Sequence, residues 1–195
     1  MNVPPPARGL LVVLSGPSGV GKTTLCERLC SLHGWKRVVT ATTRPPRGGE
    51  RDGVDYHFLS DGEFERRVRA NGFLEHARVF SRRYGTPREA VEAPLVRGEV
   101  LLLPIDVQGA AQVRVSLPSA LRIFLLPPDL STLEARLSGR GTEDEARRAE
   151  RLRVARDELA RQGEYDHRVV NGDLGQAERD IARLVEIARS GKGLS

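Results

Sequence analysis

Gly16-Pro17-Ser18-Gly19-Val20-Gly21-Lys22-Thr23 fits the pattern G-x-x-x-x-G-K-S/T, in which glycines let successive backbone N–H groups converge on phosphate oxygens. The apolar run at residues 10–14 precedes this loop and predicts a buried strand, and a helical pattern over residues 21–33 follows it. This setting favours phosphate binding, because the positive end of the helix dipole adds to the attraction. A glycine-rich turn that only joins a strand to a helix is the structural alternative.

The pattern predicts roles for single side chains in this phosphate loop. Lys22 is expected to reach the β- and γ-phosphates of a nucleoside triphosphate, and the Thr23 hydroxyl is expected to bind a Mg²⁺ ion directly. The residues expected to contact the triphosphate are Gly16, Pro17, Ser18, Gly19, Val20, Gly21, Lys22, Thr23 and Thr24.

Strand-like runs alternate with helical patterns along the rest of the chain. The strand-like runs are residues 100–105, 121–126 and 168–170, and the helical patterns are 107–115, 130–137, 143–161 and 174–188. This alternation is typical of an α/β domain in which helices flank a parallel sheet.

The length of 195 residues, 39% of them hydrophobic, favours one domain. Two stretches interrupt the alternation, one rich in Gly, Arg and turn residues and one helical and rich in Arg. We predict a core of residues 10–39, 90–126 and 157–190, with insertions at 40–89 and 127–156.

Composition narrows the class of partner. Lys and Arg number 31 against 26 Asp and Glu, a formal net charge of +5, and aromatic residues make up 5%. Basic and acidic residues are interspersed, so nucleic-acid binding is disfavoured, and compact phosphate ligands suit the many arginines better. No apolar run approaches the roughly 18 residues of a membrane span. We expect a cytoplasmic protein without a membrane partner, either a monomer or a homodimer.

Ordered motifs after the loop resemble the guanylate kinase family. They are TATTRPPRGGE at 40–50, GVDY at 53–56, FLE at 73–75, YGT at 84–86, IDVQG at 105–109, LPP at 126–128, RGT at 140–142 and VN at 170–171. The resemblance spans about residues 10–188. It implies a P-loop NTPase-type α/β fold, with residues 40–89 as a subdomain that binds GMP and 127–156 as a helical lid. The implied reaction, with Mg²⁺, is ATP + GMP to ADP + GDP; dGMP is left open as an acceptor.

The resemblance also implies which residues bind GMP. Arg44 and Arg47 match arginines that bind its phosphate, and Tyr56 and Tyr84 match tyrosines that bind the same phosphate. Solvation of the arginines and core packing of the tyrosines are the structural alternatives. The implied GMP contacts are Thr40, Arg44, Arg47, Tyr56, Glu75, Tyr84, Thr86 and Asp106.

Glu75 matches the carboxylate that reads guanine in the family. Guanine presents two neighbouring donors, N1–H and the 2-amino group, and one carboxylate accepts both. Adenine has an acceptor at N1 and would leave Glu75 poorly paired, so discrimination against AMP is expected. Thr40 and Thr86 would add hydroxyl contacts to the base. An ordinary exposed glutamate is the structural alternative.

Asp106 follows an apolar run and is expected near the metal and the acceptor, binding Mg²⁺ through water. The family usually has Asp-Ile-Asp here, whereas this chain has Pro104-Ile105-Asp106. Proline lacks the ladder N–H and is unusual in a core strand. Our hypothesis is that Asp106 alone suffices to bind the water shell of Mg²⁺, with some loss of rate or Mg²⁺ affinity.

Arg140 and Arg151 match two family arginines on a mobile lid, which would close onto the transferring phosphoryl group. With Lys22 and Arg44 they are the expected catalytic residues. Asn171 matches a position that contacts the adenine of ATP, and a turn-forming Asn is its alternative.

Two other functions are left open. A scaffold module would bind a protein partner without catalysis, and the intact phosphate loop disfavours it. A phosphoryl-transfer enzyme with another acceptor, such as a ribose phosphate, is disfavoured by Glu75 and Thr86.

Overall fold

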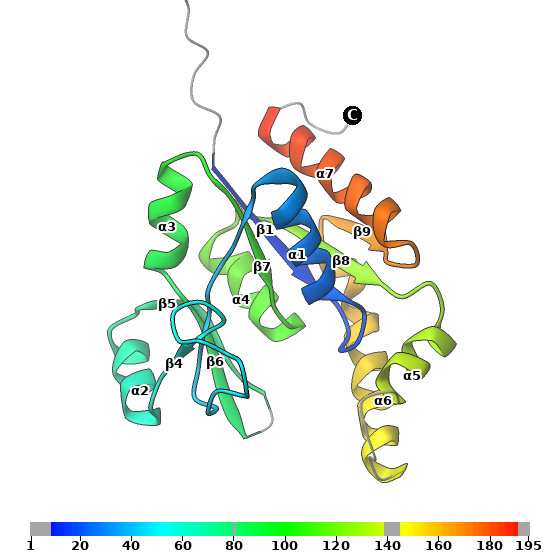
Figure 1. Cartoon of the computed structure of the whole chain (residues 1–195), viewed down its shortest axis with the longest axis horizontal. Coiled ribbons are helices and arrows are strands. Elements are labelled where there is room, and N and C mark those ends of the chain that lie inside the picture. Colours follow the sequence, from blue (N-terminus) through cyan, green and yellow to red (C-terminus); the bar gives the residue numbers. More distant parts are fainter. Residues whose placement is uncertain (1–8, 80, 139–144, 191–195) are drawn as a thin grey trace, which may run out of the picture.

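The computed structural model describes residues 9–79, 81–138 and 145–190. A five-stranded parallel sheet occupies the centre, in the order β2-β7-β1-β8-β9 (Figure 1). Its strands are β1 (Leu10–Ser15), β2 (Lys36–Arg37), β7 (Val100–Pro104), β8 (Leu121–Leu126) and β9 (His167–Val170).

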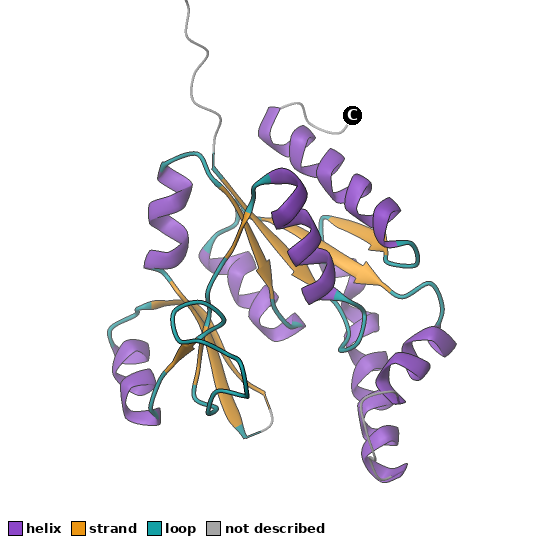
Figure 2. Cartoon of the chain, viewed as in Figure 1, coloured by secondary structure: helices purple, strands orange, loops and turns teal. Residues whose placement is uncertain are grey.

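Helices cover both faces of this sheet, as Figure 2 shows. One face packs against α1 (Lys22–His33) and α7 (Leu174–Ser190), and the other against α3 (Glu89–Val96) and α4 (Val107–Ser116). Val12 and Leu14 of β1 belong to the first core cluster, and Leu11 and Val13 to the second. Because side chains alternate along a strand, both faces of β1 need apolar residues, which explains its uninterrupted apolar run.

The expected helices and strands of this core are confirmed, with ends that differ by a few residues. The helical patterns after residue 127 correspond to α5 (Leu130–Ser138) and α6 (Glu145–Ala160), which pack together through Leu133, Leu137 and Ala155. Strand β2 was not predicted, because two polar residues carry no periodic pattern. Among the described residues, no helix is long and apolar enough to cross a membrane.

Residues between 41 and 87 form a second, mixed sheet, in the order β4-β3-β6-β5. Its strands are β3 (Ala41–Thr42), β4 (His57–Phe58), β5 (Phe73–Val79) and β6 (Arg82–Pro87). Helix α2 (Asp61–Arg69) packs against it, with the rings of Phe64 and Phe73 stacked 4.6 Å apart. The prediction of an insertion contained no sheet, because two of these strands are only two residues long.

Helix α4 connects the four-stranded sheet, called the small sheet below, to the core. The Gln112 side chain accepts a hydrogen bond from the His76 N–H at 3.1 Å and donates one to the His76 carbonyl at 2.7 Å. Leu74, two residues earlier on β5, is buried in the core cluster that includes α4. The backbone of β5 is therefore fixed against α4.

Pro104 ends β7 at a place where its missing N–H disturbs no pairing with β1. Ile105 N–H donates to the Leu14 carbonyl at 3.2 Å, so the N–H of residue 104 would face the opposite edge of β7. On that edge β2 pairs with residues 101 and 102. Residues 102 and 104 are two apart in the strand, so their side chains point to the same face of the sheet. Leu102 packs in the core cluster on the face covered by α1, which we call the α1 face. Pro104 therefore faces the side of the sheet on which the phosphate loop enters α1.

Candidate functional site

The phosphate loop lies between β1 and α1, as the sequence predicts. Gly16, Gly19 and Gly21 have φ angles of 141°, 81° and 97°, which L-residues rarely adopt. The Lys22 ammonium lies back over the loop and donates to the carbonyls of Gly16 at 2.6 Å and Pro17 at 3.1 Å. The loop is thus curled around the side chain expected to bind phosphate.

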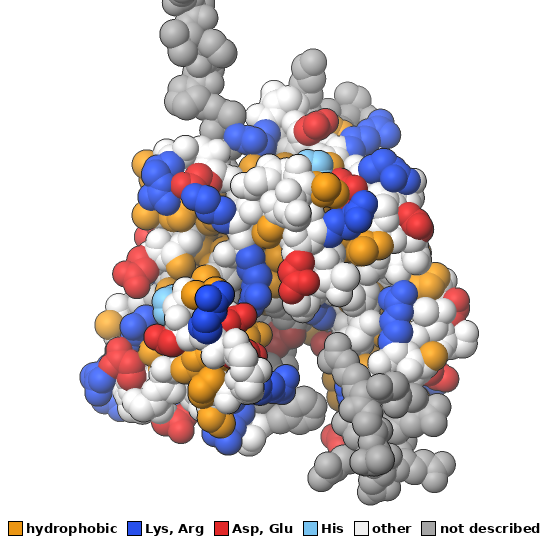
Figure 3. All heavy atoms as spheres, in the orientation of Figure 1, with side chains coloured by type: hydrophobic (Ala, Val, Ile, Leu, Met, Phe, Trp, Pro, Cys, Tyr) orange, Lys and Arg blue, Asp and Glu red, His pale blue; other side chains and the backbone are white. Residues whose placement is uncertain are grey.

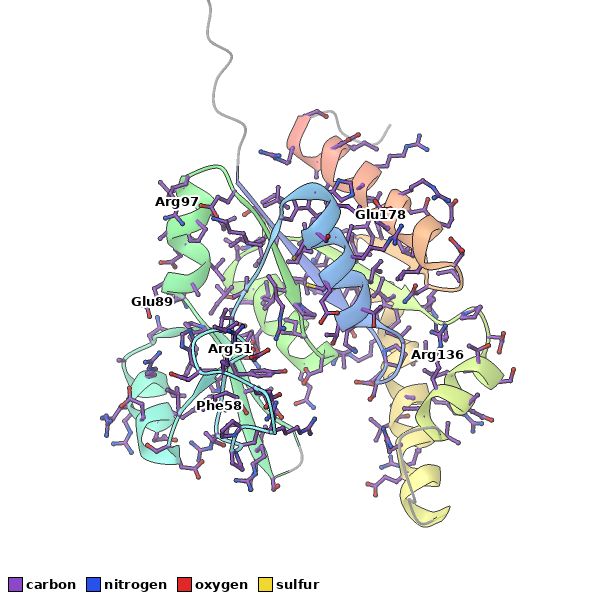
Figure 4. All side chains as sticks on the ribbon, viewed as in Figure 1. Arg51, Phe58, Glu89, Arg97, Arg136 and Glu178 are labelled. Carbon is purple, nitrogen blue, oxygen red and sulfur yellow. The ribbon has the colours of Figure 1, made fainter. Side chains whose placement is uncertain are left out.

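Two side chains from distant elements contact the Val20 carbonyl of the loop. Asn171, which follows β9 and is 6% exposed, donates from Nδ2 at 2.8 Å. Arg136 extends from α5 toward the loop, and its Nη1 lies 3.5 Å from the same carbonyl (Figure 4). Asn171 therefore stabilises the loop, a contact different from both sequence interpretations; its adenine contact stays a prediction.

A buried carboxylate and hydroxyl pair across two strands of the small sheet. Glu75 of β5 is 4% exposed and stands opposite Thr86 of β6. The Thr86 hydroxyl donates to Glu75 Oε1 at 2.6 Å. A Cβ added at Gly109 of α4 would lie 2.7 Å from Glu75 Oε2, so glycine leaves the room that this carboxylate occupies. Thr40, also buried, directly precedes β3.

The surroundings of Glu75 favour its protonated form. Burial raises the pKa of Glu75 to about 7; the nearby Asp106 carboxylate adds to the shift, and the Thr86 hydrogen bond opposes it. A carboxylate with a pKa near neutrality is primed for a ligand that supplies new donors, because each donor stabilises its charged form.

Arg44, Tyr56 and Tyr84 come together beside Glu50. Nη1 and Nη2 of Arg44 donate to Glu50 Oε2 and Oε1, each at 2.6 Å, and the guanidinium lies 4.9 Å from the centre of the Tyr56 ring. The Tyr56 and Tyr84 rings are 6.3 Å apart. This ion pair raises the pKa of Arg44 and lowers the pKa of Glu50 to about 2. The Arg47 backbone N–H also donates to Glu50 Oε2, at 2.7 Å, while its side chain is exposed.

Asp106 caps the N-terminus of α4. Its Oδ1 accepts from the backbone N–H groups of Gln108 at 2.8 Å and Gly109 at 2.9 Å. Its charge raises the pKa of Glu75 and also that of Glu158 on α6. Asp106 is thus electrostatically coupled to both the small sheet and α6.

Arg151, one of the two predicted lid arginines, lies on α6 and is half-buried. Arg140 lies outside the described residues. Figure 3 shows Lys and Arg side chains interspersed among Asp and Glu on the face that it draws.

Comparison with known proteins identifies the family. A family model described as guanylate kinase matches residues 8–188. The chain is 48% identical over 183 residues to a guanylate kinase from Neisseria meningitidis, a match that covers 93% of this chain and 89% of the relative. It is 45% identical over 179 residues to one from Synechocystis sp., covering 91% of this chain and 94% of the relative.

The chain belongs to the guanylate kinase family. The crystal structure of guanylate kinase from Anaplasma phagocytophilum superposes with a TM-score of 0.76 at 32% identity, covering 94% of this chain and 87% of that one. The expected family and the P-loop NTPase-type α/β fold are therefore confirmed.

Two carboxylates of this guanylate kinase family member were not predicted as site residues. Glu50 lies within the quoted motif at 40–50, six residues after Arg44, and an acid so near an arginine in one turn was an available signal. Glu158 gave no such signal, because its contact with Ser18 joins residues 140 positions apart.

Gly21 provides a test of the loop geometry. A Cβ at Gly21 would lie 2.5 Å from Asn171 Nδ2, so Gly21→Ala is expected to displace Asn171 from the Val20 carbonyl. Losing a buried hydrogen bond costs about 1–3 kcal/mol, and ATP binding measured by calorimetry should weaken by about fivefold to a hundredfold. Gly34→Ala is the matched control, with a φ of 66° and open space around the added Cβ. Unchanged ATP binding by Gly21→Ala would contradict this account.

Proposed function

We propose that the chain transfers the terminal phosphoryl group of ATP to GMP, giving ADP and GDP. The observation that carries the proposal is the buried Glu75–Thr86 pair next to α4, within electrostatic reach of Asp106. A buried carboxylate is costly unless hydrogen-bond donors compensate it. Thr86 supplies one donor, and the two adjacent donors of guanine match a carboxylate. The names of the relatives support the same acceptor.

The donor nucleotide binds at the phosphate loop. Ten residues form its proposed site: Gly16, Pro17, Ser18, Gly19, Val20, Gly21, Lys22, Thr23, Thr24 and Asn171. Lys22, now bonded to loop carbonyls, turns its ammonium to the β- and γ-phosphates. Asn171 keeps the loop curled through Val20 and contacts the adenine from the end of β9.

The acceptor binds over the small sheet. Arg44 exchanges the Glu50 carboxylate for the phosphate of GMP, because two phosphate oxygens can also accept two parallel hydrogen bonds from a guanidinium. Tyr56, Tyr84 and Arg47 add contacts to that phosphate. Glu75 reads the guanine edge, and the Thr40 and Thr86 hydroxyls complete the contacts to the base.

Catalysis requires two anionic ligands to be brought together. The acceptor phosphate oxygen is already negatively charged, so no general base is needed. Lys22, Arg44, Arg140 and Arg151 supply positive charge around the transferring group, and closure of residues 127–156 over it excludes water. Residues 40–89 and 127–156 are accordingly the GMP-binding subdomain and the lid.

Mg²⁺ fits the oxygen atoms present. In nucleotide enzymes this ion is held mainly by phosphates and waters with one or two protein oxygens, and among the described residues no cluster of three His, Cys, Asp or Glu side chains exists to hold a metal alone. The Thr23 hydroxyl, exposed at the start of α1, would bind it directly and Asp106 through water. Bound there, Mg²⁺ neutralises charge on the outer phosphates.

The proposed substrates indicate where the enzyme works and what it binds. ATP and GMP are cytoplasmic metabolites, which supports a cytoplasmic enzyme, and the interspersed surface charges (Figure 3) support small phosphate ligands over nucleic acid. A monomer and a homodimer are both compatible with this proposal.

The proposed reaction predicts a specific acceptor profile. ADP production from ATP and Mg²⁺ is measured with GMP, dGMP, AMP, CMP and UMP in turn. GMP alone among the ribonucleotides is expected to support turnover, because only guanine offers two donors to Glu75. Binding of GMP without turnover would favour the scaffold alternative, and turnover with a different acceptor would contradict the assignment.

The raised pKa of Glu75 predicts pH-dependent GMP binding. Guanine pairs with the charged form, so below pH 7 the affinity for GMP should fall about tenfold per pH unit. GMP carries a phosphate that itself titrates near pH 6, so the ratio of dissociation constants for wild type and Glu75→Gln isolates the carboxylate. Calorimetry from pH 5.5 to 8.5 should show this ratio approaching one at low pH. A ratio that is constant across the range would count against the role of Glu75.

The proline in β7 predicts a measurable dependence on Mg²⁺. Pro104→Asp places a carboxylate on the α1 face and is expected to lower severalfold the Mg²⁺ concentration that gives half-maximal rate. Pro104→Ala is the control, because it restores the backbone N–H without a carboxylate. Identical Mg²⁺ titrations for all three enzymes would show that the missing carboxylate does not matter.

A further inference from the structure

Glu158, near the end of α6, contacts the phosphate loop across a large sequence separation. Its Oε2 accepts a hydrogen bond from the backbone N–H of Ser18 at 3.3 Å. Backbone N–H groups of this loop are the donors that bind phosphate oxygens. A carboxylate oxygen of the chain therefore lies at a place that suits an oxygen of the triphosphate.

The charges around Glu158 agree with this placement. Burial raises the pKa of Glu158 above its usual value; the Lys22 ammonium, which attracts the carboxylate, opposes this shift, and repulsion by Asp106 adds to it. Glu158 thus lies among the groups proposed to bind the outer phosphates and Mg²⁺. The carboxylate and the triphosphate carry the same sign of charge, so they compete for this place.

The position of Glu158 on α6 connects this contact to the proposed catalytic machinery. Residues 151 and 158 are seven apart, which is almost two helical turns, so they share one face of α6. At 1.5 Å per residue, Arg151 lies about 10 Å farther along that face. Helix α6 is therefore held at the loop by the same face that carries Arg151.

We propose that Glu158 is a positioning residue that holds α6 at the phosphate loop of the ATP-free enzyme, occupying the place of a phosphate oxygen at Ser18 until ATP displaces it. Displacement releases this end of α6 and couples the arrival of the triphosphate to the placement of Arg151. The inference rests on the proposed function, because ATP is the displacing ligand.

Equilibrium titration without GMP tests the competition. Glu158→Gln keeps the shape of the side chain and removes its charge, so ATP should bind about three- to tenfold more tightly, as for a partly exposed charged contact. AMP, which lacks the two outer phosphates, should bind unchanged. Asp157→Asn is the matched control: Asp157 is exposed on the same helix and lies 3.4 Å from Arg153, so its loss should leave ATP affinity unchanged.

Steady-state kinetics distinguishes positioning from a purely structural role. The KM for ATP should fall in Glu158→Gln while the KM for GMP stays the same, whereas general damage to the fold would change both. Thermal unfolding checks that the variant is folded. Glu158→Asp, whose carboxylate is withdrawn by one methylene, is the second variant and should also bind ATP more tightly than wild type.

ATP affinity that is unchanged or weaker in folded Glu158→Gln overturns the inference and leaves the proposed kinase activity intact. Failure of the wild-type protein to bind ATP at all would instead contradict the proposed function.

Discussion

The phosphate loop concentrates backbone N–H groups at the end of a strand buried on both faces, and the rest of the site depends on how that loop is kept curled. Its glycines adopt positive φ angles, so the conformation needs support from side chains that bind its carbonyls. Lys22 supplies part of it through the carbonyls of Gly16 and Pro17. Asn171 supplies another part through Val20 and leaves room only for glycine at position 21.

Carboxylates of the chain contact phosphate-binding groups at both proposed nucleotide sites. Glu50 accepts hydrogen bonds from both terminal nitrogens of Arg44. Glu158 accepts one from the Ser18 N–H, within electrostatic reach of Lys22. Such pairing keeps the positive groups oriented before a ligand arrives, since an unpaired charge or donor away from water is costly. Under the proposed function this pairing also sets a cost for binding, because each phosphate would have to displace a carboxylate.

Three acids from different elements, Glu75, Asp106 and Glu158, are electrostatically coupled. Asp106 caps the N-terminus of α4, and its charge raises the pKa of both Glu75 and Glu158. Pro104 stands two residues before Asp106 and adds no charge to this group. An acid at position 104 would add to the repulsion among these three carboxylates. The sheet tolerates this proline because the missing N–H would point toward the β2 edge of β7, and β2 pairs only with residues 101 and 102 there.

The sequence by itself determined the phosphate loop, the alternation of the core and the family, because contiguous apolar runs and a loop of fixed spacing are local properties. It also placed Glu75, Thr86 and Arg44 in recognisable motifs. Only the tertiary structure decided that Asn171 reaches Val20, that Glu50 pairs with Arg44 and that Glu158 meets Ser18. The first and last of these pair residues about 150 and 140 positions apart, and only the parallel sheet and the packing of α6 bring them together. The small sheet was missed for a related reason: two of its strands, β3 and β4, are only two residues long and carry no periodicity, and their hydrogen bonds are made with partners distant in the sequence.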